Sequence, residues 1–253
     1  MAQIKAALVT GAGKRIGKAI ALALAEDGYD VGVHYFSSKA EADSVVEAIK
    51  SAGRNAIAVQ ANLAEETQTA KLIDTTAEAI GPLSLLVNSA SLFENDDLET
   101  VTAESWHAHL NTNLRAPLKL SQDFSAQTIQ HANNLILNII DQRVLKLTPQ
   151  FLSYTVSKAA LFTLTQTLAQ TLGPKGVRVN GIGPGPILRN ARQSEEDWRK
   201  QNEATVLGHG ATPEDICAGV KYLIGAKAVT GQMIAIDGGQ HLCWRTPDVM
   251  VNE

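Results

Sequence analysis

The sequence predicts one α/β domain, in which a parallel sheet of seven strands carries helices on both faces. Short apolar runs of strand length alternate along the chain with longer segments of helical periodicity. No Pro/Ser-rich linker, charge block or repeat interrupts this alternation. The 253 residues, 45% of them apolar, are enough for a single sizeable core. We therefore predict one domain over residues 1–253.

The first strand-helix unit contains a glycine-rich turn. An apolar strand, Ala6 to Thr10, leads into Gly11-Ala12-Gly13-Lys14-Arg15-Ile16-Gly17 and then a helical pattern that stops at Gly28. Backbone N–H groups and the positive end of the helix dipole make such a turn an anion site, suited to a pyrophosphate. At the first strand-helix junction of an alternating chain, the turn predicts a Rossmann-type, doubly wound dinucleotide fold.

The later elements follow in the same alternation. Because parallel strands joined by helices cross over with a right hand, ligands are expected at the carboxyl ends of the strands. The predicted strands are Asp30 to His34, Asn55 to Gln60, Leu83 to Asn88, Leu135 to Ile140, Val177 to Ile182 and Met233 to Ile236, and the predicted helices are 39–52, 65–80, 103–122, the helix carrying Tyr154 and Lys158, and 213–224.

The stretch from Leu135 to Lys158 carries the candidate chemistry. Asp141 follows a strand that reads as buried on both faces, and Tyr154 and Lys158 lie four residues apart on one helical face. A tyrosine with its ordinary pKa of about 10 is a poor acid at neutral pH, and a nearby ammonium lowers that pKa. The pair then predicts proton transfer to a carbonyl or imine under reduction. Alone, the spacing equally describes an ordinary exposed helical pair.

Five ordered motifs together resemble the short-chain dehydrogenase/reductase family over essentially the whole chain. A narrower set resembles the pteridine reductase branch, which has aspartate at the position of Asp141 where most of the family has serine. The family motifs are Thr10-Gly11-x-x-x-Arg15-x-Gly17, Asn88-x-Ala90, Asn113, Tyr154-x-x-x-Lys158 and Pro184-Gly185, and the narrower ones are T-G-A-G-K-R-I-G from Thr10, H-Y-x-x-S from His34, N-S-A-S-L-F from Asn88, and Asp141.

The resemblance implies roles for individual residues. Tyr154, Lys158, Asp141 and Asn113 are the implied catalytic residues, with Asn113 holding a water that joins the lysine to solvent. Phe93 is implied to stack on a planar heteroaromatic ring over the nicotinamide, with Asp141 and Tyr154 steering a proton to a ring nitrogen. Simple loop packing for Phe93 and a strand-end cap for Asp141 are the competing interpretations.

The end of the second strand favours NADPH over NADH. A carboxylate there would bind the ribose 2′-OH and repel a 2′-phosphate, but none occurs before Glu41. Lys14 and Arg15 add positive charge, and Ser37 and Ser38 offer hydroxyl donors. The predicted NADP(H)-binding residues are Gly11, Lys14, Arg15, Ile16, Gly17, His34, Ser37, Ser38, Asn62, Leu63, Asn88, Ser89, Ala90, Tyr154, Lys158, Pro184, Gly185 and Ile187.

Substrate identity is expected in the loop from about 186 to 210. Leu188 and Trp198, with Phe93 and Asp141, are the predicted substrate contacts, and Arg189 and Arg192 complete a lid in one interpretation. In the other, this segment is a solvated helix face. The tail with His241, Trp244 and Arg245 is expected to reach a neighbouring subunit, because the resemblance implies a homotetramer.

Charge and composition limit the function classes. A net charge of −4 gives no electrostatic reason to expect nucleic acid or an anionic membrane, and no apolar stretch reaches spanning length. Cys217 and Cys243 have no metal-ligand spacing, so we expect no metal site, reduced thiols and a cytoplasmic protein without a signal peptide. The leading hypothesis is an NADPH-dependent reductase of a pterin-like substrate. The alternatives are a reductase of another small ketone or alcohol, and a non-catalytic NADP(H)-binding sensor.

Overall fold

Seven parallel strands form one sheet in the order β3-β2-β1-β4-β5-β6-β7, which confirms the predicted fold class. The computed structural model describes residues 5–127, 133–189 and 193–243. Successive strands are added outward from β1 in one direction as far as β3 and in the other from β4 onward, so the junction of β1 and β4 is the topological switch point where doubly wound sheets bind ligands. The strands are β1 Ala6–Val9, β2 Asp30–Tyr35, β3 Ala56–Gln60, β4 Leu85–Asn88, β5 Asn134–Ile139, β6 Val177–Pro184 and β7 Met233–Ile236.

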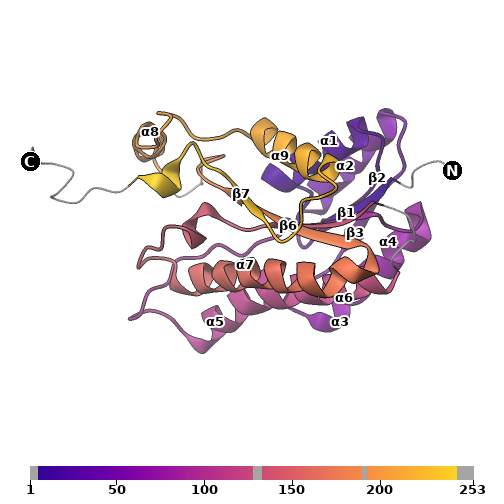
Figure 1. Ribbon diagram of the computed structural model, residues 1–253, viewed down its shortest axis with the longest axis horizontal. Coiled ribbons are helices and arrows are strands. Elements are labelled where there is room, and N and C mark those ends of the chain that lie inside the picture. Colours follow the sequence, from indigo (N-terminus) through magenta and orange to yellow (C-terminus); the bar gives the residue numbers. More distant parts are fainter. Residues whose placement is uncertain (1–4, 128–132, 190–192, 244–253) are drawn as a thin grey trace, which may run out of the picture.

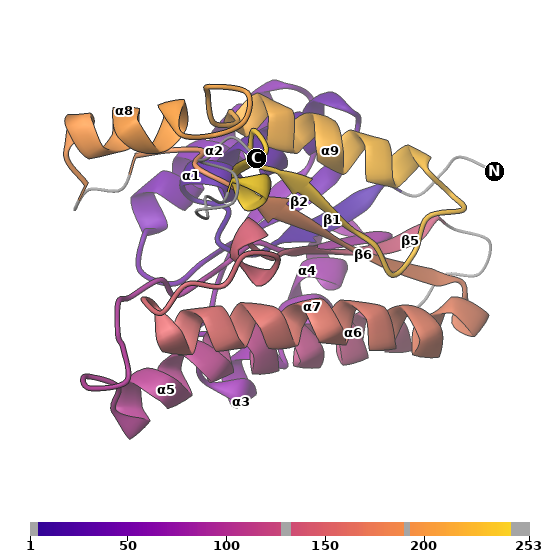
Figure 2. The same ribbon diagram turned by 60° about the vertical axis from the view of Figure 1, so that its left-hand side comes forward.

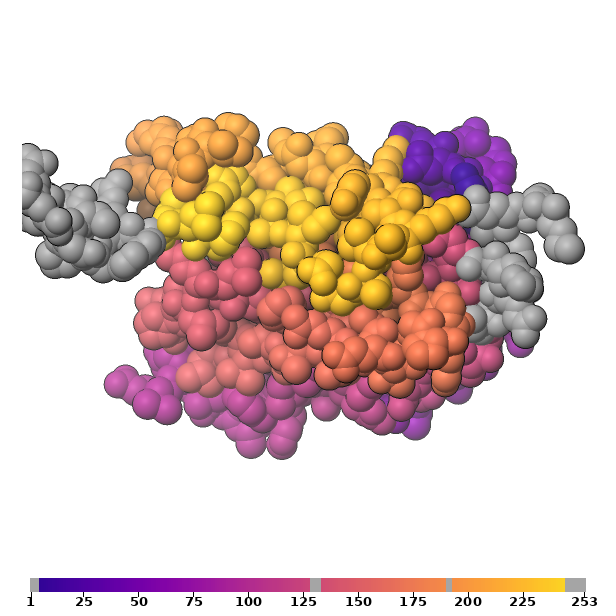
Figure 3. Space-filling view, viewed as in Figure 1, coloured from indigo at the N-terminus to yellow at the C-terminus, as the bar shows by residue number. Residues whose placement is uncertain are grey.

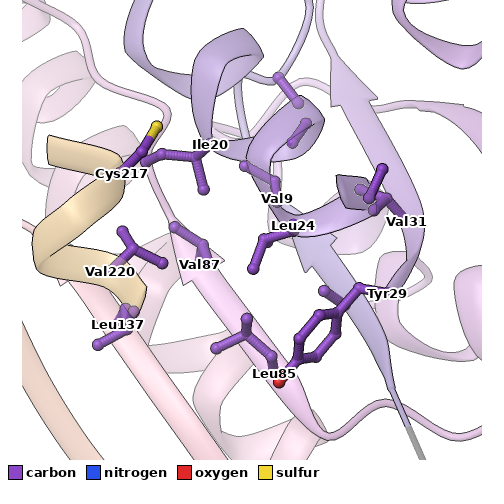
Figure 4. Close-up of a cluster of buried hydrophobic side chains, with 14 of the residues drawn as sticks. Val9, Ile20, Leu24, Tyr29, Val31, Leu85, Val87, Leu137, Cys217 and Val220 are labelled. Atoms are coloured by element: carbon purple, nitrogen blue, oxygen red, sulfur yellow. The ribbon is translucent and has the colours of Figure 1, made fainter. Parts of the chain in front are cut away.

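Helices cover both faces of the sheet, and each face has its own apolar core (Figure 1). Helices α1, α2 and α9 lie on one face, and Figure 4 shows Ile20, Leu24 and Val220 from this layer packed around Val9 and Val87 of the central strands. Helices α4, α6 and α7 lie on the other. The helices are α1 Arg15–Glu26, α2 Lys39–Ser51, α3 Glu66–Thr69, α4 Leu72–Ile80, α5 Ala103–Leu110, α6 Ala116–Ala126, α7 Leu152–Leu172, α8 Glu195–Glu203 and α9 Pro213–Gly225.

Two predicted helices are broken in the structure. The helix expected over 65–80 is α3 and α4, separated where Thr69 is fully buried and donates its hydroxyl to the carbonyls of Leu63 and Glu65. The helix expected over 103–122 contains a turn of π-helix, η1 Asn111–Arg115, between α5 and α6. A π-turn inserts an extra residue and often marks a functional position. Apolar periodicity does not reveal it, since the residues on both sides keep helical spacing.

Loops and short helices make up the part of the molecule beyond the carboxyl ends of β5, β6 and β7. Helix α8 stands apart from the two helical layers at this end (Figure 2). The turn η4 Gln240–Leu242 contacts η2 Gln142–Val144, and in the space-filling view these yellow and salmon surfaces adjoin (Figure 3). Within the described residues, no helix is long and apolar enough to cross a membrane.

The side chain of His34 is buried beneath the glycine turn and hydrogen-bonds to the backbone on both sides. Its Nδ1 accepts the N–H of Gly11 at 3.0 Å, and its Nε2 donates to the carbonyl of Ala61 at 3.2 Å. The side chain is only 2% exposed, and burial lowers the pKa of His34 to about 4. Both ring nitrogens of His34 bond to the backbone, so neither is free for the predicted contact of His34 with NADP(H). Its observed role is to join the turn to the loop after β3.

We expect the protein to lose stability in mild acid through His34. The unfolded chain binds a proton at a pKa near 6.5 and the folded chain only near 4, so stability is complete above 6.5 and falls as the pH drops towards 4. The free energy of unfolding should decrease by up to about 3 kcal/mol through this residue. Urea denaturation from about pH 7 to about pH 4 measures the slope. His34→Gln keeps a donor and an acceptor but cannot titrate, so an unchanged slope in that variant would contradict the assignment.

Candidate active site

Tyr154, Lys158 and Asp141 meet at the carboxyl end of β5. The Tyr154 hydroxyl donates to Oδ2 of Asp141 at 2.7 Å, and Nζ of Lys158 donates to the carbonyl of Ile139 at 2.8 Å. Tyr154 and Lys158 are 5% and 2% exposed. Helix α7 supplies the phenol and the amine, and the residues at and just after the end of β5 supply their partners. The predicted pair is therefore a buried cluster and not an exposed helical pair.

The expected lowering of the Tyr154 pKa by Lys158 is outweighed by burial and by Asp141. Burial raises the pKa of Tyr154 well above its ordinary value, and the Asp141 carboxylate raises it further by charge and by accepting the hydroxyl proton. Burial also lowers the pKa of Lys158, to about 8, because a buried ammonium loses its hydration. Sequence spacing showed the amine but not the carboxylate that lies closer to the phenol. The tyrosine is thus a protonated donor at rest.

The start of α7 is fixed by Asp96, which the sequence reasoning missed. Its Oδ1 accepts the N–H of Ser153 at 2.9 Å, its Oδ2 accepts the hydroxyl of Ser105 at 2.6 Å, and its carbonyl accepts the N–H of Leu152. Asp96 is 3% exposed. A carboxylate at a helix N-terminus satisfies unpaired N–H groups and complements the helix dipole. The loop after β4 is thereby joined to the helix that presents Tyr154.

Asn113 joins the π-turn to the same loop. Its side-chain amide donates to the carbonyl of Leu92 and to the hydroxyl of Ser157, and its oxygen accepts the N–H of Leu92 at 2.8 Å. Ser157 in turn donates to the carbonyl of Tyr154. The Asn113 side chain thus positions both the loop and α7. The implied water beside the lysine stays a prediction.

An aromatic stack flanks the tyrosine. The rings of Phe93 and Phe151 are parallel within 3° with centroids 4.4 Å apart, and Phe93 meets Tyr154 nearly edge-on at 4.6 Å. Phe151 has a left-handed backbone with φ of 58°, which is uncommon for a bulky residue. The Arg143 guanidinium lies 5.2 Å from the centroid of Phe151. Phe93 thus lies between Phe151 and Tyr154 at the edge of the cluster, and neither Phe151 nor Arg143 was predicted.

The glycine turn has the geometry that a dinucleotide requires. Gly11 has φ of 65°, and a Cβ there would lie 2.9 Å from Cα of Ala90. A Cβ on Gly17 would collide with the carbonyl oxygen of Gly11 at 2.3 Å. The turn therefore brings the start of α1 against the end of β1, with Ile16 half-buried behind it. The hydroxyl of Thr10 accepts the N–H groups of Ser89 and Ala90, which fixes the neighbouring β4 loop.

A cleft of about 410 Å³ beside this turn is rich in positive charge. Lys14, Arg15 and Lys18 line it together with Ser44. Glu41 also lies there and forms an ion pair with Lys14 at 2.7 Å. Ser37 is exposed, and the hydroxyl of Ser38 lies close to the turn, 3.1 Å from the position of a Cβ on Gly13. The cleft fits a phosphate group next to the pyrophosphate turn, and sequence reasoning overlooked Lys18.

The remaining predicted cofactor residues also lie at this edge of the sheet. Asn62 uses its Oδ1 to cap the N–H of Ala64, and Leu63 is buried beside it. Nδ2 of Asn88 donates to Oδ1 of Asn138 at 2.8 Å, while Oδ1 of Asn88 is buried and accepts no hydrogen bond in the described structure. Pro184 ends β6, followed by Gly185 and the buried Ile187. The side chains of Asn62 and Asn88 thus lie at the edge of the sheet where NADP(H) is expected to bind.

The predicted substrate loop is only partly placed at the site. Arg15 donates to the carbonyls of Leu188 and Arg189 at 2.9 and 3.2 Å, so it links the glycine turn to this loop. The Leu188 side chain packs against the apolar core on the sheet face that α1, α2 and α9 cover. Trp198 is half-buried on the otherwise mostly exposed α8, and no described hydrogen bond or ring contact joins it to the Tyr154 cluster. Arg192, Trp244 and Arg245 lie outside the described residues, and His241 bonds with Asp237 at 2.7 Å.

Comparison with known proteins identifies the family. The sequence pattern of the family described as enoyl-(acyl carrier protein) reductase matches residues 11–241. The chain belongs to the short-chain dehydrogenase/reductase family. It is an oxidoreductase of that family, and the Tyr154, Lys158 and Asn113 cluster is intact. The resemblance deduced from the motifs is confirmed.

Relatives with similar structures include two proteins from Brucella. FolM alternative dihydrofolate reductase 1 from Brucella canis, complexed with NADP, is 41% identical with a TM-score of 0.93, covering 98% of this chain and 100% of that one. The Brucella suis protein of that name, also with NADP, is 43% identical with a TM-score of 0.92, covering 96% and 98%. The 3-oxoacyl-[acyl-carrier-protein] reductase FabG of Staphylococcus aureus is 33% identical over 246 residues, covering 96% of this chain and all of the relative.

We expect Tyr154→Phe to reduce turnover with NADPH by at least about a thousandfold, since the hydroxyl that donates to Asp141 is lost. Binding of NADPH, followed by its fluorescence, should change little. Tyr222→Phe, an exposed tyrosine on α9, is the matched control. A Tyr154→Phe enzyme with wild-type turnover would show that the proton comes from another group.

Proposed function

We propose that this protein is an NADPH-dependent reductase of a pterin-like planar substrate. The observation that carries the proposal is the 2.7 Å bond from the Tyr154 hydroxyl to Asp141. A serine at this position would donate a hydrogen bond to a ketone oxygen, whereas a carboxylate accepts one. An accepting group suits a heteroaromatic ring, whose nitrogens carry protons. The half-buried Phe93 beside Tyr154 offers a stacking surface to such a ring.

The cofactor is NADP(H). The basic cleft of Lys14, Arg15 and Lys18 lies beside the pyrophosphate turn, and no carboxylate follows β2 before Glu41. Glu41 forms an ion pair with Lys14, so the negative charge of Glu41 is neutralised and repels a 2′-phosphate less. The similar Brucella proteins are complexed with NADP. When bound, the nicotinamide supplies the hydride.

In this proposal, side chains of the protein donate the proton and stabilise the charge that is left behind. Burial and Asp141 keep Tyr154 protonated, so its hydroxyl would donate the proton that a ring nitrogen takes up when the substrate is reduced. Asp141 orients that hydroxyl and takes hydrogen bonds from the ring. Lys158 lies 5.7 Å from the centroid of the tyrosine ring, close enough for its ammonium form to stabilise negative charge on the phenol oxygen. A cytoplasmic location and a homotetramer stay predictions.

A second candidate is the reduction of a 3-oxoacyl thioester or another small ketone. It is favoured by the 33% identity with FabG over nearly the whole chain. In that case Asp141 has to be protonated in order to donate to the ketone oxygen, as serine does elsewhere in the family. A sensor without turnover is the third hypothesis, and the intact proton-transfer cluster argues against it.

A substrate panel with wild-type protein and Asp141→Ser separates these functions. With NADPH, and with NADH as the comparison, we expect the wild type to reduce dihydropterins faster than acetoacetyl-CoA or simple ketones. Asp141→Ser should lower pterin turnover by about a hundredfold and raise the ratio of ketone to pterin turnover, because serine restores a hydroxyl donor. Oxidation of NADPH, followed by its absorbance, measures both.

Ser91→Ala serves as the control for a small polar change near the site, since the Ser91 hydroxyl is exposed and bonds only weakly to Asn113 at 3.3 Å. The proposal fails if the wild type prefers ketones to every pterin, or if Asp141→Ser reduces pterins at the wild-type rate.

A further inference from the structure

Arg143 is a cation that belongs to the site but not to the proton-transfer cluster. It lies on η2, two residues beyond Asp141, and its guanidinium covers the ring of Phe151 at 5.2 Å. Phe151 stacks on Phe93, which contacts Tyr154. Ring contacts through Phe151 and Phe93 thus connect the guanidinium to Tyr154, and the charge of Arg143 lies near enough to act on the phenol. A group bound by Arg143 would therefore lie in the same site as the reacting ring.

The charge of Arg143 has no counter-ion in the described part of the chain. Arg54, Arg115 and Arg199 each pair with a carboxylate, but no described carboxylate lies within ion-pair distance of Arg143. Its Nη1 donates to the hydroxyl of Thr148, and its Nε is buried without an acceptor. A half-buried guanidinium with unused donors is costly unless a ligand completes it.

Arg143 is also held at a fixed position relative to the acid. Its backbone N–H donates to Oδ1 of Asp141 at 2.7 Å, while Oδ2 of the same carboxylate accepts the Tyr154 hydroxyl. Phe151, beneath the guanidinium, is fixed by its left-handed backbone and by an N–H bond to Asn95 at 3.2 Å. The distance between proton donor and cation is therefore set by the protein. A substrate with one reacting ring and one anionic group could place the ring at Tyr154 and the anionic group at Arg143.

We propose that Arg143 binds the carboxylate at the end of a substrate's side arm. The preferred substrate is then a dihydropterin ring that carries an acidic arm, as dihydrofolate does, and not an unconjugated pterin. The planar guanidinium presents two parallel N–H groups, which match the two oxygens of a carboxylate. This inference rests on the proposed function, because it requires the ring to stack beside Phe93 and Tyr154.

The test compares dihydrofolate with its dimethyl ester and with 7,8-dihydrobiopterin, using NADPH as reductant. The ester keeps the length of the arm and removes both negative charges. For the wild type, kcat/KM should be about tenfold higher for dihydrofolate than for the ester. Arg143→Gln should abolish that preference, mainly through KM, and Arg143→Lys should restore only part of it because the planar fork is missing. Lys146→Gln removes a charge three residues along the same loop and should leave the preference unchanged.

The outcomes separate this inference from the proposed function. If pterins are reduced but dihydrofolate and its ester are equivalent, or if Lys146→Gln has the same effect as Arg143→Gln, the role of Arg143 is overturned while the pterin reductase stands. If no pterin is reduced and acetoacetyl-CoA is, both proposals fail together. Should Arg143→Gln not fold, as judged by NADPH binding, the comparison of acid and ester in the wild type decides the question.

Discussion

The hydrogen bond between Tyr154 and Asp141 is the interaction on which the rest of the site depends. It joins a phenol from α7 to a carboxylate just beyond β5, inside an environment that disfavours both phenolate and ammonium. The proton therefore stays on the tyrosine until a ligand changes the balance of charge. Most of the family has a serine at the position of Asp141, and that serine would donate a hydrogen bond to the oxygen of a carbonyl substrate. Here a carboxylate, which accepts the Tyr154 hydroxyl, stands at that position.

The scaffold behind this bond is unusually polar for a buried region. Asp96 holds the first turn of α7, Asn113 joins the π-turn to the loop after β4, and Asn138 bonds both to Asn88 and to Thr165. Each of these side chains is at most 3% exposed. Buried hydrogen-bonded side chains of this kind favour one arrangement of elements, although Oδ1 of Asn88 has no donor in the described structure. They fix the phenol, the aromatic stack and the nucleotide edge in one geometry.

Sequence reasoning found the fold and pointed to Tyr154, Lys158 and Asp141, which the structure brings together, because those features have local signatures. The glycine turn, the buried strand before Asp141 and the four-residue spacing of Tyr154 and Lys158 can be seen in the sequence. The pKa of Tyr154 could not be predicted, because it depends on which charge lies closest in space. The sequence also did not predict the roles of Asp96, Phe151 and Arg143, since these roles arise from contacts between the loop after β4, η2 and the start of α7. A left-handed phenylalanine has no sequence signature at all.

The protonation of Tyr154 in the free protein is the most direct test. Ultraviolet difference titration follows phenolate formation, and subtracting the curve of Tyr154→Phe isolates this residue from the other tyrosines. The structure predicts that Tyr154 ionises only well above its ordinary pKa of about 10, and at lower pH in Asp141→Asn, which lacks the negative charge. Ionisation of Tyr154 near neutral pH, or a curve unaffected by Asp141→Asn, would contradict the account.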